Sequence, residues 1–467
     1  MDPRVPVHDL LIIGGGFGAC SALAWLARLA PKAMRVAVMI GSRTPADGAD
    51  NFYGCGLAYG AQDPTHLLNS AHWNMGLLLD EPDGFTHWLS AQSPTKKLSD
   101  FVPRAEYGAF LQSKWHENLK LLTLKGVEVH VIQQSAISIL ELTDRFVTIV
   151  DDAGTNHSCA AVLVCMGPTL ISETGLRHEK LISPIWPHGL QCLKGACGQV
   201  VIIGTGLSGI DAAISALAEP EVTKLTMISR DGRLPLAHDA AARERLDVQF
   251  KGCPLEVLKT IRTAASRVPW QAVMNALRDQ SNIIWHDWTT IERRLALRHL
   301  SGMWTAHRNR LPPDVLRQVE TAIDHGRLEI IKSFTRLHFD NDGHVCVQLI
   351  GSGGIIKPDW VVDARGFARI NMNMNSFFGQ ALRDGHFNTS GLGYGIAGDK
   401  SHRVTPLGLA PIHVVGAARI GDLIETTGAP EVRTQVHQSL EALLKPNHPV
   451  KVSRHMNCQE NGSSAID

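Results

Sequence analysis

A stretch near the N-terminus, residues 8–28, constrains the fold of this chain more than any other. An apolar run, Leu10 to Ile13, leads into three consecutive glycines and then into a segment rich in Ala and Leu. Gly14, Gly16 and Ala19 occupy the pattern G-x-G-x-x-G/A, whose first glycine permits a tight turn and whose second lets a pyrophosphate approach the backbone. The stretch predicts a buried strand, a glycine turn and a helix whose N-terminus faces a dinucleotide. A glycine-rich turn without a ligand is the alternative, and the flanking strand and helix argue against it.

The same pattern recurs about 190 residues later, after a β-branched run. Gly204, Gly206 and Gly209 fill its three positions. The next predicted strand ends in Ser229-Arg230, with no acidic residue to hold a ribose 2′-hydroxyl. An arginine there can make a bidentate contact with a 2′-phosphate, so this second site is predicted to prefer NADP(H) over NAD(H). A solvated arginine at a strand end is the alternative.

The first motif lacks a feature that is usual in FAD sites. The second predicted strand, residues 35–40, is normally followed by an Asp or Glu that binds the adenosine ribose. Gly41-Ser42 stand there instead. Ser42 is the candidate substitute.

Two β-rich segments, residues 127–167 and 328–366, follow one plan. Each is predicted to form an antiparallel meander that leads to a strand ending in glycine, and the second glycine motif lies between them. The expected fold class is α/β with two Rossmann-like dinucleotide-binding domains, the NADP domain inserted in the FAD domain, plus a helical insert. We expect an FAD-binding domain at 1–170 and 355–445. We expect an NADP-binding domain at 196–354 with a helical insert at about 237–324, and a disordered tail at 446–467.

Three segments outside the glycine motifs supply further candidates. The connector after the first motif mixes Gly, Asn, His and aromatic residues; we interpret it as a wall for a flavin ring, with Asn69, Trp73 and Asn74 near the ring, although a turn-rich connector is the alternative. Residues 413–433 predict a strand, a turn and a helix that points its N-terminus at the flavin. The Trp-rich insert is interpreted either as a packed cap or as a substrate lid. The residues expected to bind the cofactors are Gly14, Gly16, Phe17, Gly18, Ala19, Ser42, Asn69, Gly167, Gly204, Gly206, Gly209, Ser229, Arg230, Gly416, Asp422 and Pro430.

Composition excludes several function classes. The 467 residues are enough for two or three domains, and 45 basic residues balance 45 acidic ones, which argues against nucleic acid or an anionic membrane as partner. No membrane-spanning run or signal peptide is recognisable. The nine cysteines form no disulfide framework, so we expect a reducing, cytoplasmic setting. The 22 histidines show no metal-ligand spacing, and no metal site is expected.

The chain resembles the FAD/NAD(P)-binding family related to bacterial YdhS, which includes aspartate N-oxygenases that form nitrosuccinate. The resemblance extends to about residue 440. Its distinctive parts are Gly56-Leu-Ala-Tyr59 with His66-Leu-Leu-Asn69, Val102-Pro-Arg104 with Tyr107-Gly108, Ser229-Arg230, His307-Arg308 with Arg310, and Pro430-Glu-Val-Arg433. The departures are Gly41-Ser42 in place of the acidic strand end and Cys165-Met166-Gly167 in place of the usual Ala-Thr-Gly.

This resemblance implies FAD, NADPH and a monooxygenase reaction. NADPH would reduce the flavin, oxygen would form a C4a-hydroperoxide, and a small amine or amino acid would be N-hydroxylated, with His307, Arg308 and Arg310 orienting a carboxylate. Oxygenation of carbon or sulfur, and a non-enzymatic FAD-binding sensor, are the alternatives. A disulfide reductase is a third alternative, because Cys192 and Cys197 have C-x₄-C spacing. These cysteines, however, lie in the connector just before the second motif, whereas in such enzymes the pair directly follows the first dinucleotide-binding unit.

Overall fold

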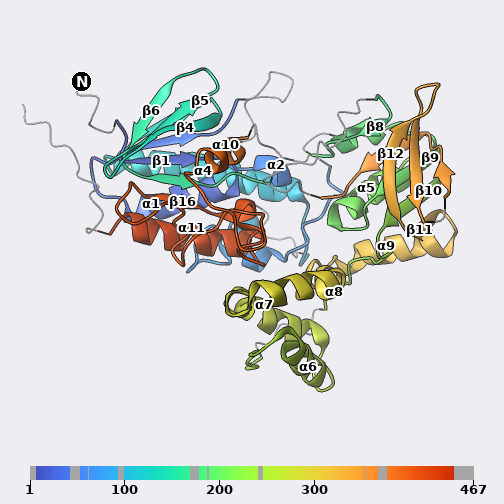
Figure 1. Ribbon diagram of the computed structural model, residues 1–467. Coiled ribbons are helices and arrows are strands. Elements are labelled where there is room, and N and C mark those ends of the chain that lie inside the picture. The colour runs from blue at the N-terminus through green and yellow to red at the C-terminus, as the bar shows by residue number, and fades with distance from the viewer. Residues whose placement is uncertain are drawn as a thin grey trace, which may run out of the picture.

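The computed structural model describes residues 7–42, 53–60, 63–92, 99–168, 178–186, 189–239, 246–351, 353–366 and 376–445. The expected tail at 446–467 lies outside these residues. Figure 1 shows two sheet-containing units side by side, with a group of helices below them. No helix in the described ranges is long and apolar enough to cross a membrane.

The first unit is built on a five-stranded parallel sheet in the order β16-β7-β1-β2-β3. Its strands are β16 (Ile412–Val414), β7 (Val162–Val164), β1 (Leu10–Ile13), β2 (Arg35–Met39) and β3 (Glu128–Ile132). Both faces of a parallel sheet must be covered, and alternate side chains of β1 enter different cores. Leu10 and Ile12 pack toward the helices, whereas Leu11 and Ile13 pack toward an antiparallel sheet.

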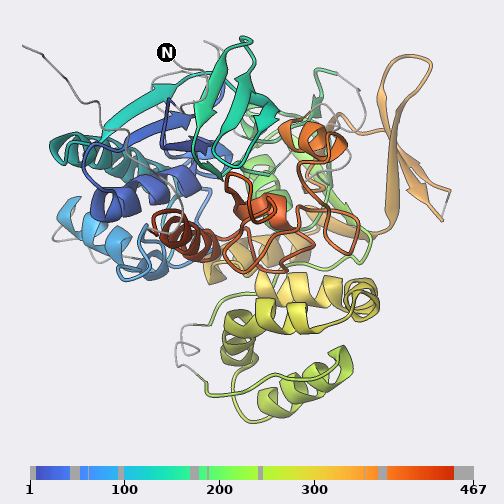
Figure 2. The same ribbon diagram turned by 60° about the vertical axis from the view of Figure 1, so that its left-hand side comes forward.

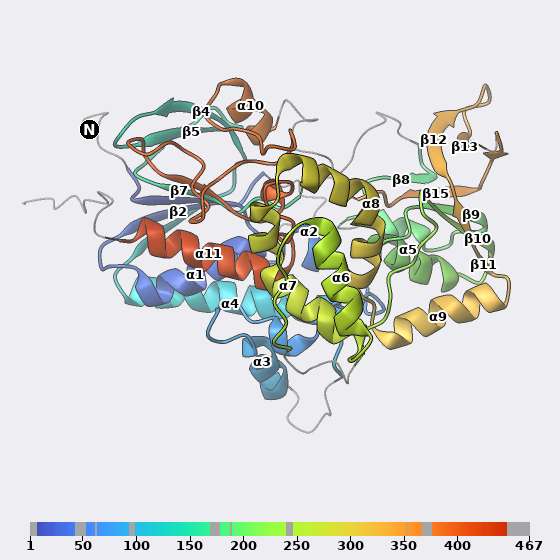
Figure 3. The ribbon, with the colours of Figure 1, turned by 60° about the horizontal axis from the view of Figure 1, so that its bottom comes forward.

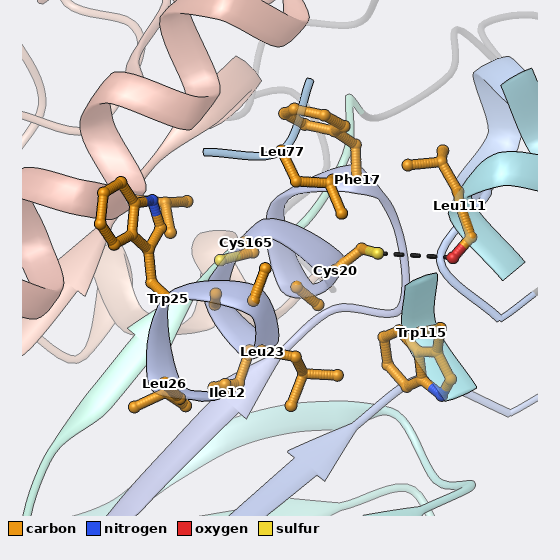
Figure 4. Close-up of a cluster of buried hydrophobic side chains, with 14 of the residues drawn as sticks. Ile12, Phe17, Cys20, Leu23, Trp25, Leu26, Leu77, Leu111, Trp115 and Cys165 are labelled. Carbon is orange, nitrogen blue, oxygen red and sulfur yellow. Dashed lines mark hydrogen bonds between the residues drawn. The ribbon is translucent and has the colours of Figure 1, made fainter. Parts of the chain in front are cut away.

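Three long helices cover one face of this sheet, namely α1 (Phe17–Leu29), α4 (Arg104–Leu124) and α11 (Ala429–Leu443). Figure 4 shows how α1 is held: its own Leu23, Trp25 and Leu26 project into the surrounding core, and its Cys20 thiol donates to the carbonyl of Leu111 on α4 at 3.5 Å. Burial raises the pKa of the Cys20 thiol far above its usual range. This thiol is therefore a packing group rather than a nucleophile.

An antiparallel sheet and one helix cover the other face. The sheet consists of β4 (Ala136–Leu142), β5 (Val147–Asp151) and β6 (Asn156–Cys159), and α10 (Phe377–Arg383) packs on β4. The short elements α2 (Gly56–Tyr59), η2 (His72–Asn74) and α3 (Gly84–Gln92) lie in the connector between β2 and α4. Figure 2 shows the antiparallel sheet above the parallel one, with α11 below it.

The second unit repeats this plan. Its parallel sheet has the order β11-β10-β9-β15-β8, formed by β11 (Leu328–Lys332), β10 (Val222–Ser229), β9 (Gly198–Ile203), β15 (Trp360–Asp363) and β8 (Leu181–Ile182). On one face lie η3 (Gly189–Leu193), α5 (Leu207–Leu217) and α9 (Pro313–Asp324). On the other lies an antiparallel sheet of β12 (Phe334–Phe339), β13 (Val345–Ile350) and β14 (Ile355–Ile356). The expected fold class is confirmed.

Three of the expected domain boundaries differ from the observed packing. β14 and β15 pair with strands of the second unit, although residues 355–363 were expected in the first. β8 also joins the second sheet, so the chain changes units earlier than residue 196. Helix α9 was expected in the helical insert, but it packs on α5 because Val315, Val319 and Ala322 face the second core. Strand pairing favours a second unit spanning residues 178–366.

The remaining insert consists of α6 (Pro254–Ala265), α7 (Trp270–Asp287) and α8 (Thr290–Arg308). Thr289 caps α8 together with Glu292 in a reciprocal capping box. Val257, Val273, Leu277 and Ile284 form a small core of their own. Figure 3 shows these helices in front of the junction between the two units.

Candidate functional site

A cleft of about 700 Å³ opens along the carboxyl edge of the first parallel sheet. This edge is where parallel α/β sheets bind ligands. The glycine loop, the end of β2, α2, the segment after β7 and the start of α11 all contribute to it. Its lining includes Gly14, Gly16, Phe17, Gly18, Ser42, Tyr59, Arg104, Gly167, Thr427, Gly416 and Ala429.

Backbone geometry explains the first glycine of the loop but not the second. Gly14 has φ +130°, and a Cβ there would lie 2.7 Å from the carbonyl oxygen of Cys165. A Cβ on Gly16 would meet nothing closer than Gly56 Cα at 3.4 Å. The fold therefore tolerates a methyl group at Gly16. A larger side chain there would obstruct the cleft. This is the arrangement expected where a pyrophosphate approaches the backbone at a helix N-terminus.

The second glycine loop has the same arrangement. Gly204 has φ +117°, and its Cβ would lie 2.4 Å from the carbonyl oxygen of Ala364. A Cβ on Gly209 would lie 2.2 Å from the carbonyl oxygen of Gly204. No atom lies within 4 Å of the position of a Cβ on Gly206, which is the N-cap of α5. Gly206 thus faces open space, Gly16 is bare backbone in the cleft lining, and both loops fit a dinucleotide.

The end of β10 presents the two residues expected to read the ribose. The hydroxyl of Ser229 accepts a hydrogen bond from Gly232 N at 3.0 Å and lies 2.9 Å from the hydroxyl of Thr205. Arg230 is exposed and forms no hydrogen bond or ion pair with the described residues. Its guanidinium is therefore available to an anion.

A carboxylate reaches the end of β2 from another part of the chain. The hydroxyl of Ser42 donates to Asp152, which lies in the turn between β5 and β6. The backbone N–H of Ser42 donates to the hydroxyl of Ser135 at 2.8 Å, and Asp152 N donates to Ser135 O at 2.9 Å. The hydrogen bond from Ser42 lowers the pKa of Asp152, so this carboxyl group stays ionised. The position that usually holds an acidic residue thus has an acidic group beside it.

Several predicted site residues lie outside the cleft lining. The main-chain oxygen of Asn69 lies 2.9 Å from His238 Nε2, and Asn74 Oδ1 accepts a hydrogen bond from Arg433 at 3.1 Å. Trp73 packs its ring edge-on to His72. Asp422 forms an ion pair with the fully buried Arg419. Asn69, Trp73 and Asn74 are partly buried and Asp422 is buried, so all four lie beside the cleft lining rather than in it, and their roles at the flavin stay predictions.

The remaining predicted residues are in three environments. Ala19 lies in the first turn of α1 and is fully buried, as its packing role requires. Pro430 occupies the first turn of α11, one residue from Ala429 in the lining. Gly416 N donates to Gln435 Oε1 at 2.8 Å, which ties the cleft wall to α11.

A second cavity of about 310 Å³ lies between the helical insert and residues 420–427. Arg308 lines it and pairs with Glu425 and Glu431. His307 points elsewhere: its Nδ1 lies 2.8 Å from Met303 O and its ring packs on Trp270. Arg310 is buried and bonds to Asn275, and burial lowers its pKa to about 10. Of the three residues expected to orient a carboxylate, only Arg308 lines this cavity.

A buried ion pair connects the two sheet units. Arg104 on α4 lines the cleft and donates to Asp211 on α5 at 2.8 Å, and it also donates to Leu67 O. Trp186 packs under the guanidinium and donates to Ser208 at 3.3 Å. Sequence reasoning did not name Arg104, Asp152 or Glu425 as site residues, although Arg104 and Glu425 lie in segments that it singled out, because the partner of each is more than 100 residues away in the chain.

Comparison with known proteins agrees with this geometry. Residues 11–169 match the family model described as FAD-NAD(P)-binding. No curated protein matches the sequence significantly.

Among solved structures, the fold is similar to ornithine N-hydroxylase from Kutzneria sp. 744, with TM-score 0.61 and 13% identity over 94% of this chain and 99% of that one. It is also similar to a cadaverine monooxygenase from Erwinia amylovora, with TM-score 0.60 and 11% identity over 99% and 100%. A bacillithiol disulfide reductase from Staphylococcus aureus aligns with TM-score 0.53 and 13% identity over 94% and 99%. At these identities the similarity establishes the fold alone, so the reaction has to be inferred from the residues of the site.

Proposed function

We propose that the protein is an FAD- and NADPH-dependent monooxygenase that N-hydroxylates a small amine or amino acid. The observation that carries this proposal is the pair of glycine loops, in which neither φ nor a close neighbour of the backbone requires glycine at Gly16 or Gly206. The similarity in fold to an ornithine N-hydroxylase and a cadaverine monooxygenase supports an amine as substrate. The resemblance to aspartate N-oxygenases adds aspartate to the candidates.

The chain's own residues would bind and enclose the cofactors. The N-terminal N–H groups of α1 and α5 would hold the two pyrophosphates, Arg230 would bind a 2′-phosphate, and the start of α11 would face the flavin ring. FAD reduced by NADPH would supply oxygen activation, which is the cofactor's chemistry. The protein's task is to position the amine and to exclude water from the cleft.

The test combines oxygen consumption, NADPH oxidation and product mass over a panel of amines and amino acids. We expect at least one amine to couple NADPH oxidation to a product heavier by one oxygen atom. If every amine yields only hydrogen peroxide while a ketone or thioether is oxygenated, carbon or sulfur is the target. If no compound stimulates NADPH oxidation, the result favours a non-enzymatic FAD-binding sensor over an enzyme.

The disulfide reductase alternative lacks structural support in the described residues. Cys192 and Cys197 are both exposed and lie in and after η3, on the second unit. Neither lines the cleft at the first glycine loop. Anaerobic NADPH titration would detect them, because a redox-active pair takes up two electrons beyond those needed by the flavin.

A further inference from the structure

The cavity between the helical insert and residues 420–427 has apolar walls. Its sides include Val257, Ile284, Leu300, Trp285, Trp288 and Trp304. Two of the indole N–H groups are already used, since Trp285 donates to Gly421 O at 3.3 Å and Trp288 donates to Gly252 O at 2.8 Å. What these two rings present to the cavity is therefore apolar surface. Its volume of about 310 Å³ suits a small organic group.

One end of this cavity is charged. Arg308 donates from Nε at 2.8 Å and from Nη2 at 2.6 Å to the same oxygen of Glu425, Oε2. In the described part of the chain nothing donates to the other oxygen, Oε1. Asn282 clamps the backbone beneath it, because its amide accepts from Ile424 N and Glu425 N and donates to Glu425 O. The carboxylate is thus held rigidly with one acceptor position open.

The charged end is the end closest to the cofactor cleft. Thr427, two residues after Glu425, lines both the apolar cavity and the cleft. A molecule whose chain fills the cavity would therefore place its polar end at Glu425 and toward the cleft.

The charges at this end favour a cation over an anion. Arg278 and Arg308 are already paired with Glu425 and Glu431, so the four side chains balance. A carboxylate would have to displace an internal partner of Arg308, whereas an ammonium group can use Oε1 of Glu425 directly. Burial raises the pKa of Glu425, while the neighbouring Arg308 and Arg278 lower it.

We propose that this cavity is the substrate site and that the substrate is a primary amine on an apolar chain, such as an arylalkylamine. Its ammonium group binds Glu425, and its carbon chain packs against the tryptophans. The role of the amine as a substrate rests on the proposed function, whereas its binding in this cavity can be measured without the reaction. It disfavours aspartate, whose two carboxylates have no unpaired cation here.

The test is calorimetric titration of the FAD-loaded protein, without NADPH, using 2-phenylethylamine, 2-phenylethanol, ornithine and aspartate. We expect 2-phenylethylamine to bind most tightly. Ser301→Phe, which fills the cavity from α8, should raise the Kd for 2-phenylethylamine about tenfold or more. The matched control is His299→Phe, on the exposed side of the same helix, which should leave binding unchanged.

Glu425→Gln separates the charge from the apolar contact. We expect the preference for 2-phenylethylamine over 2-phenylethanol to fall about tenfold, with the alcohol binding as before. Tighter binding of aspartate or ornithine, or binding that ignores Ser301→Phe, overturns the inference. If 2-phenylethylamine binds as expected but NADPH oxidation yields only hydrogen peroxide, the cavity assignment stands and N-hydroxylation is what fails.

Discussion

Individual glycines separate what the fold requires from what a ligand requires. Gly14 and Gly204 have positive φ and close carbonyl neighbours, so substitution there strains the backbone. Gly16 and Gly206 do not: a side chain at Gly206 would extend into open space, and one at Gly16 would stand in the lining of the cleft, in ordinary contact with Gly56.

Leucine at each of these two positions should therefore remove one cofactor. We expect Gly16→Leu to fold but purify without FAD, and Gly206→Leu to keep FAD and lose reduction by NADPH. Absorbance at flavin wavelengths and anaerobic stopped-flow reduction measure the two effects. A fully flavinated Gly16→Leu protein contradicts the assignment of the first loop.

We expect Asp152 to take the place of the acidic residue that is missing at the end of β2. Its hydrogen bond with Ser42 places a carboxylate where an adenosine ribose would lie. Asp152→Asn should raise the Kd for FAD roughly tenfold, since a charge-assisted hydrogen bond is lost. Asp144→Asn, in the exposed turn between β4 and β5, is the control and should leave FAD affinity unchanged. Equal affinity in both variants would show that the ribose is held elsewhere.

Arg230 should determine the choice of nicotinamide cofactor. Its exposed guanidinium follows β10 and has no partner among the described residues. Arg230→Ala should reduce the ratio of kcat/KM for NADPH to that for NADH by about tenfold or more, with the NADH value unchanged. An unaltered ratio would mean that another residue binds the 2′-phosphate.

At the scale of elements, the helical insert is attached to the first unit by buried charges. Glu431 in the first turn of α11 pairs with Arg278 on α7 and lies 3.5 Å from Arg308 on α8. The same end of α11 lines the cofactor cleft. The N-terminal turn of α11 therefore contacts the helical insert and also lines the cofactor cleft.

Glu431→Gln should loosen this attachment. Two largely buried arginines would then share one carboxylate. Because glutamine keeps the shape and part of the hydrogen bonding, we expect a loss of about 1–3 kcal/mol in the free energy of unfolding. Urea denaturation measures it. Removing the exposed pair on α9 by Arg317→Ala should cost less than about 1 kcal/mol. A loss no greater than that of Arg317→Ala would show that the pairing contributes little.

At the scale of the whole molecule, buried histidines make stability depend on pH. Burial lowers the pKa of His8, His238 and His402 to about 4 and that of His413 to about 3. Because these values lie below the unfolded value of about 6.5, the unfolded state binds more protons as pH falls. The stabilisation is complete above pH 6.5 and is lost as pH falls toward 4.

Each of these histidines should reduce the free energy of unfolding by at most about 1.4 kcal/mol per pH unit in that window. Tm measured from pH 7.5 to 4.5 should fall steeply below pH 6.5. His413→Asn should make this slope shallower, whereas His299→Asn, exposed on α8, should not. A Tm that stays constant between pH 7 and 5 contradicts the argument.

The sequence by itself determined the fold class and the position of both cofactor loops. Local patterns were sufficient, because a strand, a glycine turn and a helix are contiguous in the chain and their residue types follow from backbone sterics and burial. The same locality explains why the strand, turn and helix predicted for residues 413–433 agree with β16 and the start of α11. The misplaced boundaries at β15 and α9 concern which core an apolar segment joins, and apolar residues alone do not specify their partner.

Only the tertiary structure decided how the site is completed. Asp152 reaches Ser42 across 110 residues, Arg104 reaches Asp211 across 107, and Arg308 reaches Glu425 across 117. None of these pairs has a periodicity or spacing that a linear pattern records. The predicted roles of Asn69, Trp73, Asn74 and Asp422 rested on their proximity in sequence to the motifs, and none of the four is in the cleft lining. Long-range pairing of buried charge is set by the packing of whole elements, and that is the information a sequence motif lacks.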